Sequence, residues 1–126
     1  MNQTYPTSEK LKSRKTIDLL FSEGKSIARF PLRLVYVEVP TLEVPLKMGV
    51  SASKKHFKKA VDRNYVKRIL REAYRVNKQL LSGLESKYAV MLLYQSKELP
   101  DFHQVNANAA KLFLKFAETA KSGNEQ

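Results

Sequence analysis

The side chains best suited to bind a ligand are Lys and Arg, and they are concentrated in one stretch of the chain. Residues 54–78 contain ten Lys and Arg against two acids, a local net charge of +8 in a chain whose total is +11. Four of the cations recur at intervals of four: Arg63, Lys67, Arg71 and Arg75. Like charges at this spacing repel each other on a helix. A solvated basic face is one explanation, but the clustering favours a polyanionic partner, namely a nucleic acid.

Other kinds of chemistry have little support in the sequence. His56 and His103 are the only histidines, there is no cysteine, and no carboxylate cluster has the spacing of metal ligands. No G-x-x-x-x-G-K-[ST] or G-x-G-x-x-G motif occurs. We therefore expect no metal site and no catalytic residue in the protein itself, and we assign His56 to the basic patch.

Two hydrophobic periodicities position the basic stretch. Apolar and small or polar residues alternate over residues 46–53, which predicts a half-buried strand of about eight residues with Gly49, Ser51 and Ser53 on one side. Spacings of three and four then predict a helix. Its expected apolar side consists of Ala60, Val61, Val66, Ile69, Leu70, Ala73, Val76 and Leu80. The basic row lies on the other side of this helix.

The remaining elements follow from local signals. A short helix is expected from its cap at Ser13 to about Glu23, with Gly24 as a left-handed C-cap. Residues 26–39 predict a short strand, a break at Pro31 and a longer strand. The apolar run over residues 88–94 is typical of an interior strand. A last helix begins near residue 100, with an apolar side formed by Val105, Ala109, Leu112, Phe113, Phe116 and Ala120.

The order α-β-β-β-α-β-α predicts an α+β two-layer sandwich in which helices pack on a four-stranded sheet. A chain of 126 residues indicates one domain over residues 1–126, with loose ends at 1–8 and 122–126. No apolar run has the length of a membrane span, and no signal-peptide core is present. The absence of cysteine suits a reducing compartment. We therefore expect a cytoplasmic protein without a membrane partner.

The run GVSASKK…KAVDRNYVKRILREAYR resembles the protein subunit of bacterial ribonuclease P. That family typically has a G-[VL]-S-V-S-K-K strand followed by a helix with R-N-R-x-K-R-x-x-R. The matching residues are Gly49, Val50, Ser51, Ser53, Lys54 and Lys55 in the strand motif and Arg63, Asn64, Lys67, Arg68 and Arg71 in the helix motif. A leading K-[LI]-K…F-x-x-G is matched by Lys10, Leu11, Lys12, Phe21 and Gly24. Tyr65 and Ile17 depart from the pattern, where a second Arg and a Phe are usual.

The resemblance implies a function in tRNA maturation. Members of the family assist a catalytic RNA that removes the 5′ leader from precursor tRNA, with Mg²⁺ ions activating a water at the scissile phosphate. The implied partners are ribonuclease P RNA and precursor tRNA, with no DNA, and the protein alone is expected to be inactive and to need no cofactor of its own. The resemblance also implies a left-handed crossover between parallel strands, against the usual preference.

Two sets of residues receive roles on this basis. Contact with the RNA subunit is expected of Arg63, Asn64, Lys67, Arg68, Arg71 and Arg75. A single-stranded leader presents phosphates and unstacked bases, which cations and aromatic rings bind. The expected leader cleft consists of Lys12, Phe21, Tyr36, Ser51, Ser53, Lys54 and Lys55, with Phe21 and Tyr36 as stacking surfaces. Core packing is the alternative for each aromatic ring, and a hydrogen bond at the helix start is the alternative for Asn64.

Two other functional hypotheses remain open from the sequence. A non-catalytic RNA-binding protein of ribosome assembly would have the same basic helix but no leader cleft. A protein-only nuclease would need a partner for its histidine that the sequence does not show. Cleavage by the protein without RNA would identify the nuclease. Dependence of tRNA processing on the chain together with a large RNA would separate the other two hypotheses.

Overall fold

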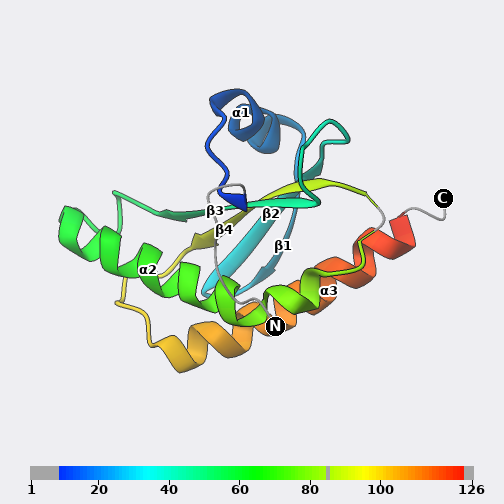
Figure 1. The fold of residues 1–126 in the computed structure, drawn as a ribbon. Helices are drawn as coiled ribbons and strands as arrows, with labels where there is room; N and C mark the ends of the chain where they lie inside the picture. The colour runs from blue at the N-terminus through cyan, green and yellow to red at the C-terminus, as the bar shows by residue number, and fades with distance from the viewer. Residues whose placement is uncertain (1–8, 85, 124–126) are drawn as a thin grey trace.

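The computed structural model describes residues 9–84 and 86–123 (Figure 1). Its elements run in the predicted order: α1 (Arg14–Glu23), β1 (Lys25–Arg29), β2 (Leu32–Glu38), β3 (Leu46–Ala52), α2 (Ala60–Asn77), a short 3-10 helix (Lys78–Leu81), β4 (Tyr88–Tyr94) and α3 (Phe102–Gly123). Of the ends expected to be loose, residues 1–8 and 124–126 lie outside the described part. Residues 122 and 123 belong to α3, which extends further than predicted.

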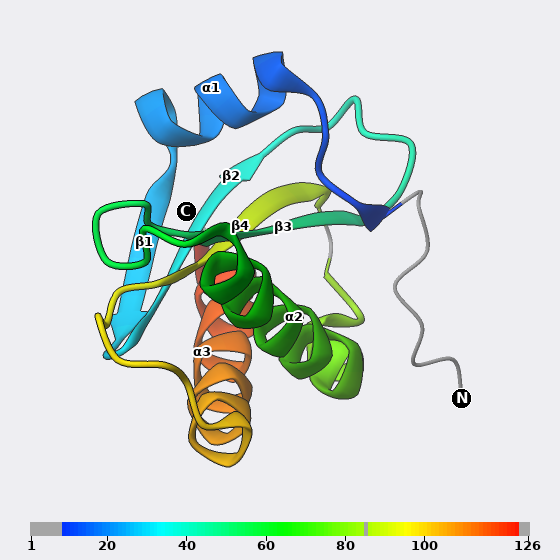
Figure 2. The ribbon, with the colours of Figure 1, turned by 90° about the vertical axis from the view of Figure 1, so that its left-hand side faces the viewer.

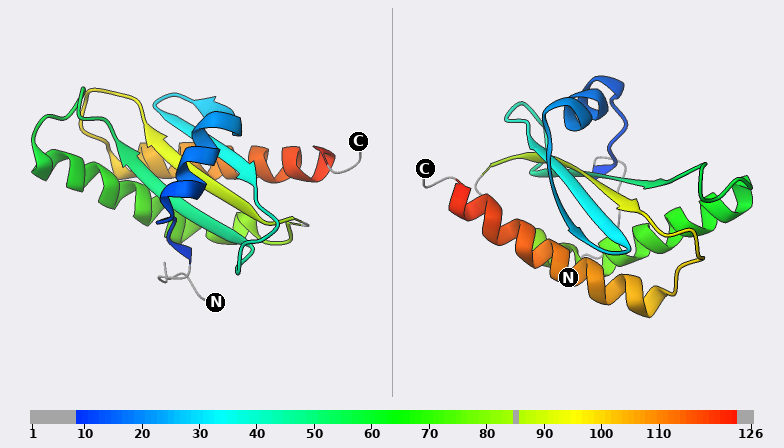
Figure 3. Two further views of the ribbon diagram at one scale, coloured as in Figure 1. Left: turned by 90° about the horizontal axis from the view of Figure 1, so that it is seen from above. Right: turned by 180° about the vertical axis from the view of Figure 1, so that it is seen from behind.

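The four strands form one mixed sheet in the order β1-β2-β4-β3. β2 pairs antiparallel with both β1 and β4, while β3 and β4 are parallel. The interior position predicted for β4 is confirmed, and all but one of its residues are buried. Because β3 and β4 are parallel neighbours, their connection through α2 is a crossover. Figure 3 (left) views the sheet from the α1 side, and the arrows of β3 and β4 point to the upper left. When this view is turned so that both arrows point upwards, β4 lies to the right of β3 and α2 lies behind the sheet. The crossover is therefore left-handed, as the resemblance implied.

Helices cover the two faces of the sheet unequally. α2 and α3 cover one face and bury the larger core cluster, which includes Leu34, Met48 and Leu92 from the strands and Phe113 and Phe116 from α3. α1 lies on the opposite face (Figures 1 and 2), where a smaller cluster joins Leu11 and Leu20 to Val35, Ala89 and Met91. The second layer of the sandwich therefore consists of α2 and α3, and α1 stands apart from it.

The two predictions made for the ends of α1 have different outcomes. The predicted cap of α1 is confirmed, because the Thr16 amide donates to the Ser13 hydroxyl at 3.3 Å. The left-handed conformation predicted for Gly24 is wrong: its φ and ψ are −72° and 156°. A Cβ at Gly24 would lie 2.1 Å from the Leu20 carbonyl oxygen. The position therefore favours glycine because the backbone passes too close to the helix end for a side chain.

The first turn of α2 does not pack as the periodicity predicts. Val61 is 69% exposed, and Ala60 is exposed as well. Figure 1 shows why: the beginning of α2 extends past the edge of the sheet, so this turn has no strand beneath it. Burial begins one turn later, at Val66. The periodicity correctly predicted the side of the helix but could not show where the sheet ends.

Candidate nucleic-acid interface

The open face of the sheet, defined as the face that carries α1, includes every second residue of β3. Alternation along β3 places Lys47, Gly49 and Ser51 on this face, opposite the core residues Met48 and Val50. A Cβ at Gly49 would approach the Met91 side chain to 3.1 Å and the Leu11 side chain to 3.4 Å. Gly49 is therefore buried beneath the Met91 and Leu11 side chains, which a larger residue would have to displace.

A first hollow on this face brings together cations from distant parts of the chain. It is lined by Lys10, Leu11, Lys12, Ile17, Gly49, Val50, Arg71 and Met91. The segment before α1 is fixed beside β3 because the Leu11 amide donates to the Met48 carbonyl at 3.0 Å. Lys12 thus lines the same hollow as Arg71 of α2. Arg71, predicted to bind the RNA subunit, lies beside a residue predicted to bind the leader.

A second hollow lies further along the same strands. It is lined by Phe30, Ser51, Ser53, His56, Leu93, Tyr94 and Gln95. The structure therefore brings together Ser51 and Ser53 of the predicted cleft. Lys54 and Lys55 follow in an exposed loop. This loop is turned by two bonds to Ser53: the Lys55 amide donates to its hydroxyl at 3.0 Å and the Phe57 amide to its carbonyl at 2.9 Å.

The two residues predicted to stack on bases, Phe21 and Tyr36, differ in their exposure to solvent. Phe21 is 58% exposed and follows Ile17, which lines the first hollow, by one helical turn on the same side of α1. Its stacking role stays a prediction. The stacking role of Tyr36 is wrong, because the residue is only 8% exposed and packs edge-on against Phe116 with ring centroids 4.8 Å apart.

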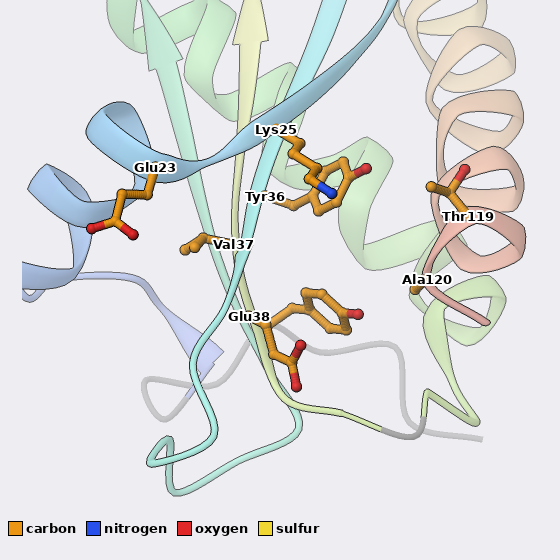
Figure 4. A pocket seen from close by; sticks show the side chains of 8 residues that line it. Glu23, Lys25, Tyr36, Val37, Glu38, Thr119 and Ala120 are labelled. Atoms are coloured by element: carbon orange, nitrogen blue, oxygen red, sulfur yellow. The ribbon is translucent and has the colours of Figure 1, made fainter. Parts of the chain in front are cut away.

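Tyr36 lies on the face of β2 that α3 covers. Figure 4 shows its ring directed towards Thr119 and Ala120 of α3, in a separate pocket that also includes Glu23 and Glu38. Burial raises the pKa of the Tyr36 hydroxyl. The side of β2 on which Tyr36 lies could have been inferred from the sequence, because Leu32 and Leu34 precede it at intervals of two and are typical core residues.

The predicted cations of α2 do not all have the same surroundings. Arg63 is partly buried, and its Nη1 donates to the carbonyls of Phe57 and Lys58 at 2.8 and 3.0 Å. It therefore holds the loop that precedes the helix. Lys67 is half-buried, whereas Arg68 and Arg71 are exposed to solvent.

The end of the basic row is partly neutralised. Arg75 forms an ion pair with Glu72 at 2.8 Å. The hydrogen bond from Arg75 lowers the pKa of the Glu72 carboxyl, and Glu72 in turn raises the pKa of Arg75. Lys78 pairs with Glu9 at 2.8 Å, and Tyr74 donates to the same carboxylate at 2.8 Å. These contacts join the segment before α1 to the end of α2, which helps to hold Lys12 in place.

Asn64 is exposed, and its position excludes the capping alternative. The N-cap of α2 is Lys59, which makes no side-chain capping bond. Asn64 lies more than one turn inside the helix, beside exposed Arg68. A role in binding RNA stays a prediction for both.

Several residues of the two hollows were not assigned to the leader cleft from the sequence. Phe30, His56 and Gln95 line the second hollow, and Lys10 and Met91 line the first. Lys10 and His56 carried a signal, since both belong to basic segments. Phe30 and Gln95 carried none, because their proximity depends on the pairing of β2 with β4.

Two absences concern only the described residues. Within residues 9–84 and 86–123, no three His, Cys, Asp or Glu side chains are grouped so that they could hold a metal ion. Over the same part of the chain, none of the helices combines the length and apolar character needed to cross a membrane.

An open sheet face lined by cations, beside a basic helix in a left-handed crossover, defines a class of nucleic-acid-binding α+β protein. The particular family is shown by comparison with known proteins. The family model described as Ribonuclease P matches residues 5–117, so the chain belongs to the ribonuclease P protein family.

Relatives and solved structures agree with this assignment. The "Ribonuclease P protein component" of Porphyromonas gingivalis strain W83 is 41% identical over 120 residues, which cover 91% of this chain and 88% of the relative. The protein of the same name from Chlorobaculum tepidum is 33% identical over 81 residues, which cover 61% and 53%. The RNase P protein from Thermotoga maritima superimposes with a TM-score of 0.69 at 25% identity, covering 85% of this chain and 96% of that one. The Staphylococcus aureus protein, at 22% identity and a TM-score of 0.68 over 89% and 97%, shares the fold.

Proposed function

We propose that this chain is the protein subunit of a ribonuclease P that removes the 5′ leader from precursor tRNA. It binds the RNA subunit through cations of α2 such as the exposed Arg68, and it binds the single-stranded leader along the open face, where Arg71 lines the first hollow. The observation that carries this proposal is the first hollow, which Lys12, Arg71 and Gly49 line together in a chain of this family. Cations that neutralise phosphates release counterions, and this release supplies much of the affinity.

Within this proposal the protein binds and orients, and the RNA subunit performs the cleavage. Lys12 and Arg71 bind leader phosphates, and Phe21 offers an exposed ring on which a base stacks. Mg²⁺ held by the RNA subunit supplies the activation of water at the scissile phosphate. The reaction would take place in the cytoplasm, where precursor tRNA is matured.

The experiment is a titration of precursor and mature tRNA against the complex reconstituted from this chain and ribonuclease P RNA. We expect tighter binding of the precursor, since only the precursor carries a leader, and a lower Mg²⁺ requirement than for the RNA alone. Equal affinity for the two tRNAs would contradict leader binding and would return the assembly-protein hypothesis to consideration. Cleavage by the protein without RNA would support the nuclease hypothesis.

A further inference from the structure

The second hollow is not explained by the leader cleft predicted from the motifs. Of its lining residues, only Ser51 and Ser53 belong to that cleft; Phe30 comes from the β1–β2 turn and Gln95 from the end of β4. The lining combines an aromatic ring with hydroxyl, amide and imidazole groups and includes no acidic side chain. A concave site with apolar walls and a few converging polar groups is typical of a ligand site.

The β1–β2 turn holds Phe30 in place. The turn is closed on one side by the pairing of Arg29 with Leu32. On the other side, the Gln95 amide donates to the Pro31 carbonyl at 2.7 Å, which fixes the turn against the end of β4. Single exposed apolar side chains are common on protein surfaces. Phe30 differs from these because it is 74% exposed and also lines a hollow with polar groups.

The polar groups of the second hollow are also held in place. Arg33 donates to the Ser26 hydroxyl at 2.7 Å and to Gln95 Oε1 at 3.4 Å. Because Gln95 Oε1 accepts this bond, the amide nitrogen of Gln95 is left to donate to a ligand. The Ser53 hydroxyl accepts from the Lys55 amide, so its hydrogen is left to donate as well. Gln95 and Ser53 can thus act as donors in the second hollow, and a ligand that supplies acceptors and an aromatic surface would match them.

We infer that the second hollow binds one unstacked nucleobase of single-stranded RNA. The base stacks on the Phe30 ring, and its acceptor atoms receive hydrogen bonds from Gln95 and from Ser51 or Ser53. The exposed Lys54 and Lys55 in the adjoining loop favour the negative charge that a nucleotide carries. A base without phosphates, or an acidic ligand without a ring, would use only half of these features.

This inference rests on the proposed function and extends it with a second base site. Gly49 lines the first hollow and Ser51 the second, and two residues of a strand span about 7 Å. The nucleotide at Phe30 is therefore a different one from the nucleotide held by Lys12 and Arg71. Phe30 becomes a specificity-determining residue for leaders long enough to reach it.

The experiment is a scan of the leader with abasic nucleotides, one position at a time, using the reconstituted complex and precursor tRNA. In the wild-type complex, the abasic change should weaken binding at the position that occupies the second hollow by about 5- to 150-fold, the range of a lost base–aromatic stack. In Phe30→Ala, an intact leader should bind more weakly by the same factor, and the abasic change at that position should have no additional effect. Phe30→Tyr should restore the wild-type pattern.

Two control variants test whether the effects in the scan depend on the aromatic ring of Phe30. Leu114→Ala changes an exposed apolar side chain on α3, far along the chain from the second hollow, and should leave every leader position unchanged. Phe30→Leu keeps apolar bulk without a ring and should behave like Phe30→Ala. Abasic effects that persist unchanged in Phe30→Ala would overturn the base site at Phe30 while leaving leader binding intact. A wild-type complex that binds precursor and mature tRNA equally would overturn both proposals.

Discussion

The two faces of the sheet are made by the same four strands but serve different purposes. The covered face, defined as the one beneath α2 and α3, presents large side chains such as Leu34, Tyr36 and Tyr88, and two helices seal it. The open face combines small residues such as Gly49, Ser51 and Ala89 with larger ones such as Val35 and Met91, and a single ten-residue helix packs on it. One short helix cannot cover a four-stranded sheet, so hollows remain beside it. The proposed binding surface therefore exists because α1 leaves part of this face without a helix packed on it.

The covered face contributes mainly to the stability of the fold, and the open face mainly to the proposed binding of RNA. Free energy of folding is concentrated on the covered face, where α3 inserts Phe113 and Phe116, both fully buried. On the open face, the cations around the first hollow repel one another unless an anion is present. Changes to the covered face should therefore affect stability, and changes to the open face should affect RNA binding.

The largest effect should follow from Phe116→Ala on the covered face. The ring of Phe116 contacts those of Tyr36 and Tyr88, with centroids 4.8 and 5.2 Å apart. Its loss leaves a cavity that the sheet cannot close, and we expect a decrease of about 3–5 kcal/mol in the free energy of unfolding. Urea denaturation measures this change. Leu114→Ala, on the exposed side of the same helix, should change stability by less than about 0.5 kcal/mol, and similar effects for both would contradict the comparison.

The covered face should also set the response to alkaline pH. Burial raises the pKa of the hydroxyls of Tyr36, Tyr88 and Tyr94 above the ordinary value. The unfolded chain therefore loses these protons at lower pH than the folded protein does. Stability should be intact below about pH 10 and should fall as the pH rises towards the folded-state pKa, by at most about 1.4 kcal/mol per pH unit for each Tyr.

The check is a series of denaturation curves from pH 8 to pH 12. Tyr36→Phe removes one of the titrating hydroxyls and should make the alkaline decrease less steep. Tyr65→Phe is the matched control, because Tyr65 is exposed on α2. A decrease of the same steepness in wild type and Tyr36→Phe would show that burial of this hydroxyl does not contribute.

Arg63 is an expected exception to the rule that residues of the covered face determine stability and the other cations only bind RNA. The sequence placed it among the RNA-binding cations on the side of the helix opposite the apolar side, but its guanidinium donates to the carbonyls of Phe57 and Lys58. Arg63→Ala should therefore lower the free energy of unfolding by about 1–2 kcal/mol, since these are partly exposed charged hydrogen bonds. Arg68→Ala, which removes an exposed cation five residues later, should not. Equal stability of the two variants in urea would return Arg63 to a purely RNA-binding role.

The sequence predicted the fold more completely than the site. Period-two alternation and the apolar run of residues 88–94 were sufficient for the strands and for the interior position of β4. Local patterns determine these features, because each residue's side depends on its own neighbours in the chain. The handedness of the crossover came only from the family resemblance, since no local pattern records it.

The site depends on contacts that no local pattern contains. Phe30 meets Ser51 and Gln95 only because β2 and β3 both pair with β4. Lys12 lines the same hollow as Arg71 only because the segment before α1 bonds to Met48. The family motif assigned Arg71 to the RNA subunit, whereas the structure places it beside the proposed leader path.

The smallest effect on stability, and the sharpest test of the open face, should come from the pair that lines the first hollow. Lys12→Ala and Arg71→Ala each remove an exposed cation without removing a buried contact, so unfolding in urea should be unchanged. Affinity of the complex for precursor tRNA should fall, and the slope of log affinity against log salt should decrease by about one unit for each lost phosphate contact. Lys115→Ala removes an exposed cation from α3 and should leave this slope unchanged. The double variant should lose about two units if both side chains contact the leader, and its deficit should disappear when the leader is trimmed away. A deficit of equal size with mature tRNA would show that Lys12 and Arg71 bind another part of the RNA, and the first hollow would then lose its assignment to the leader.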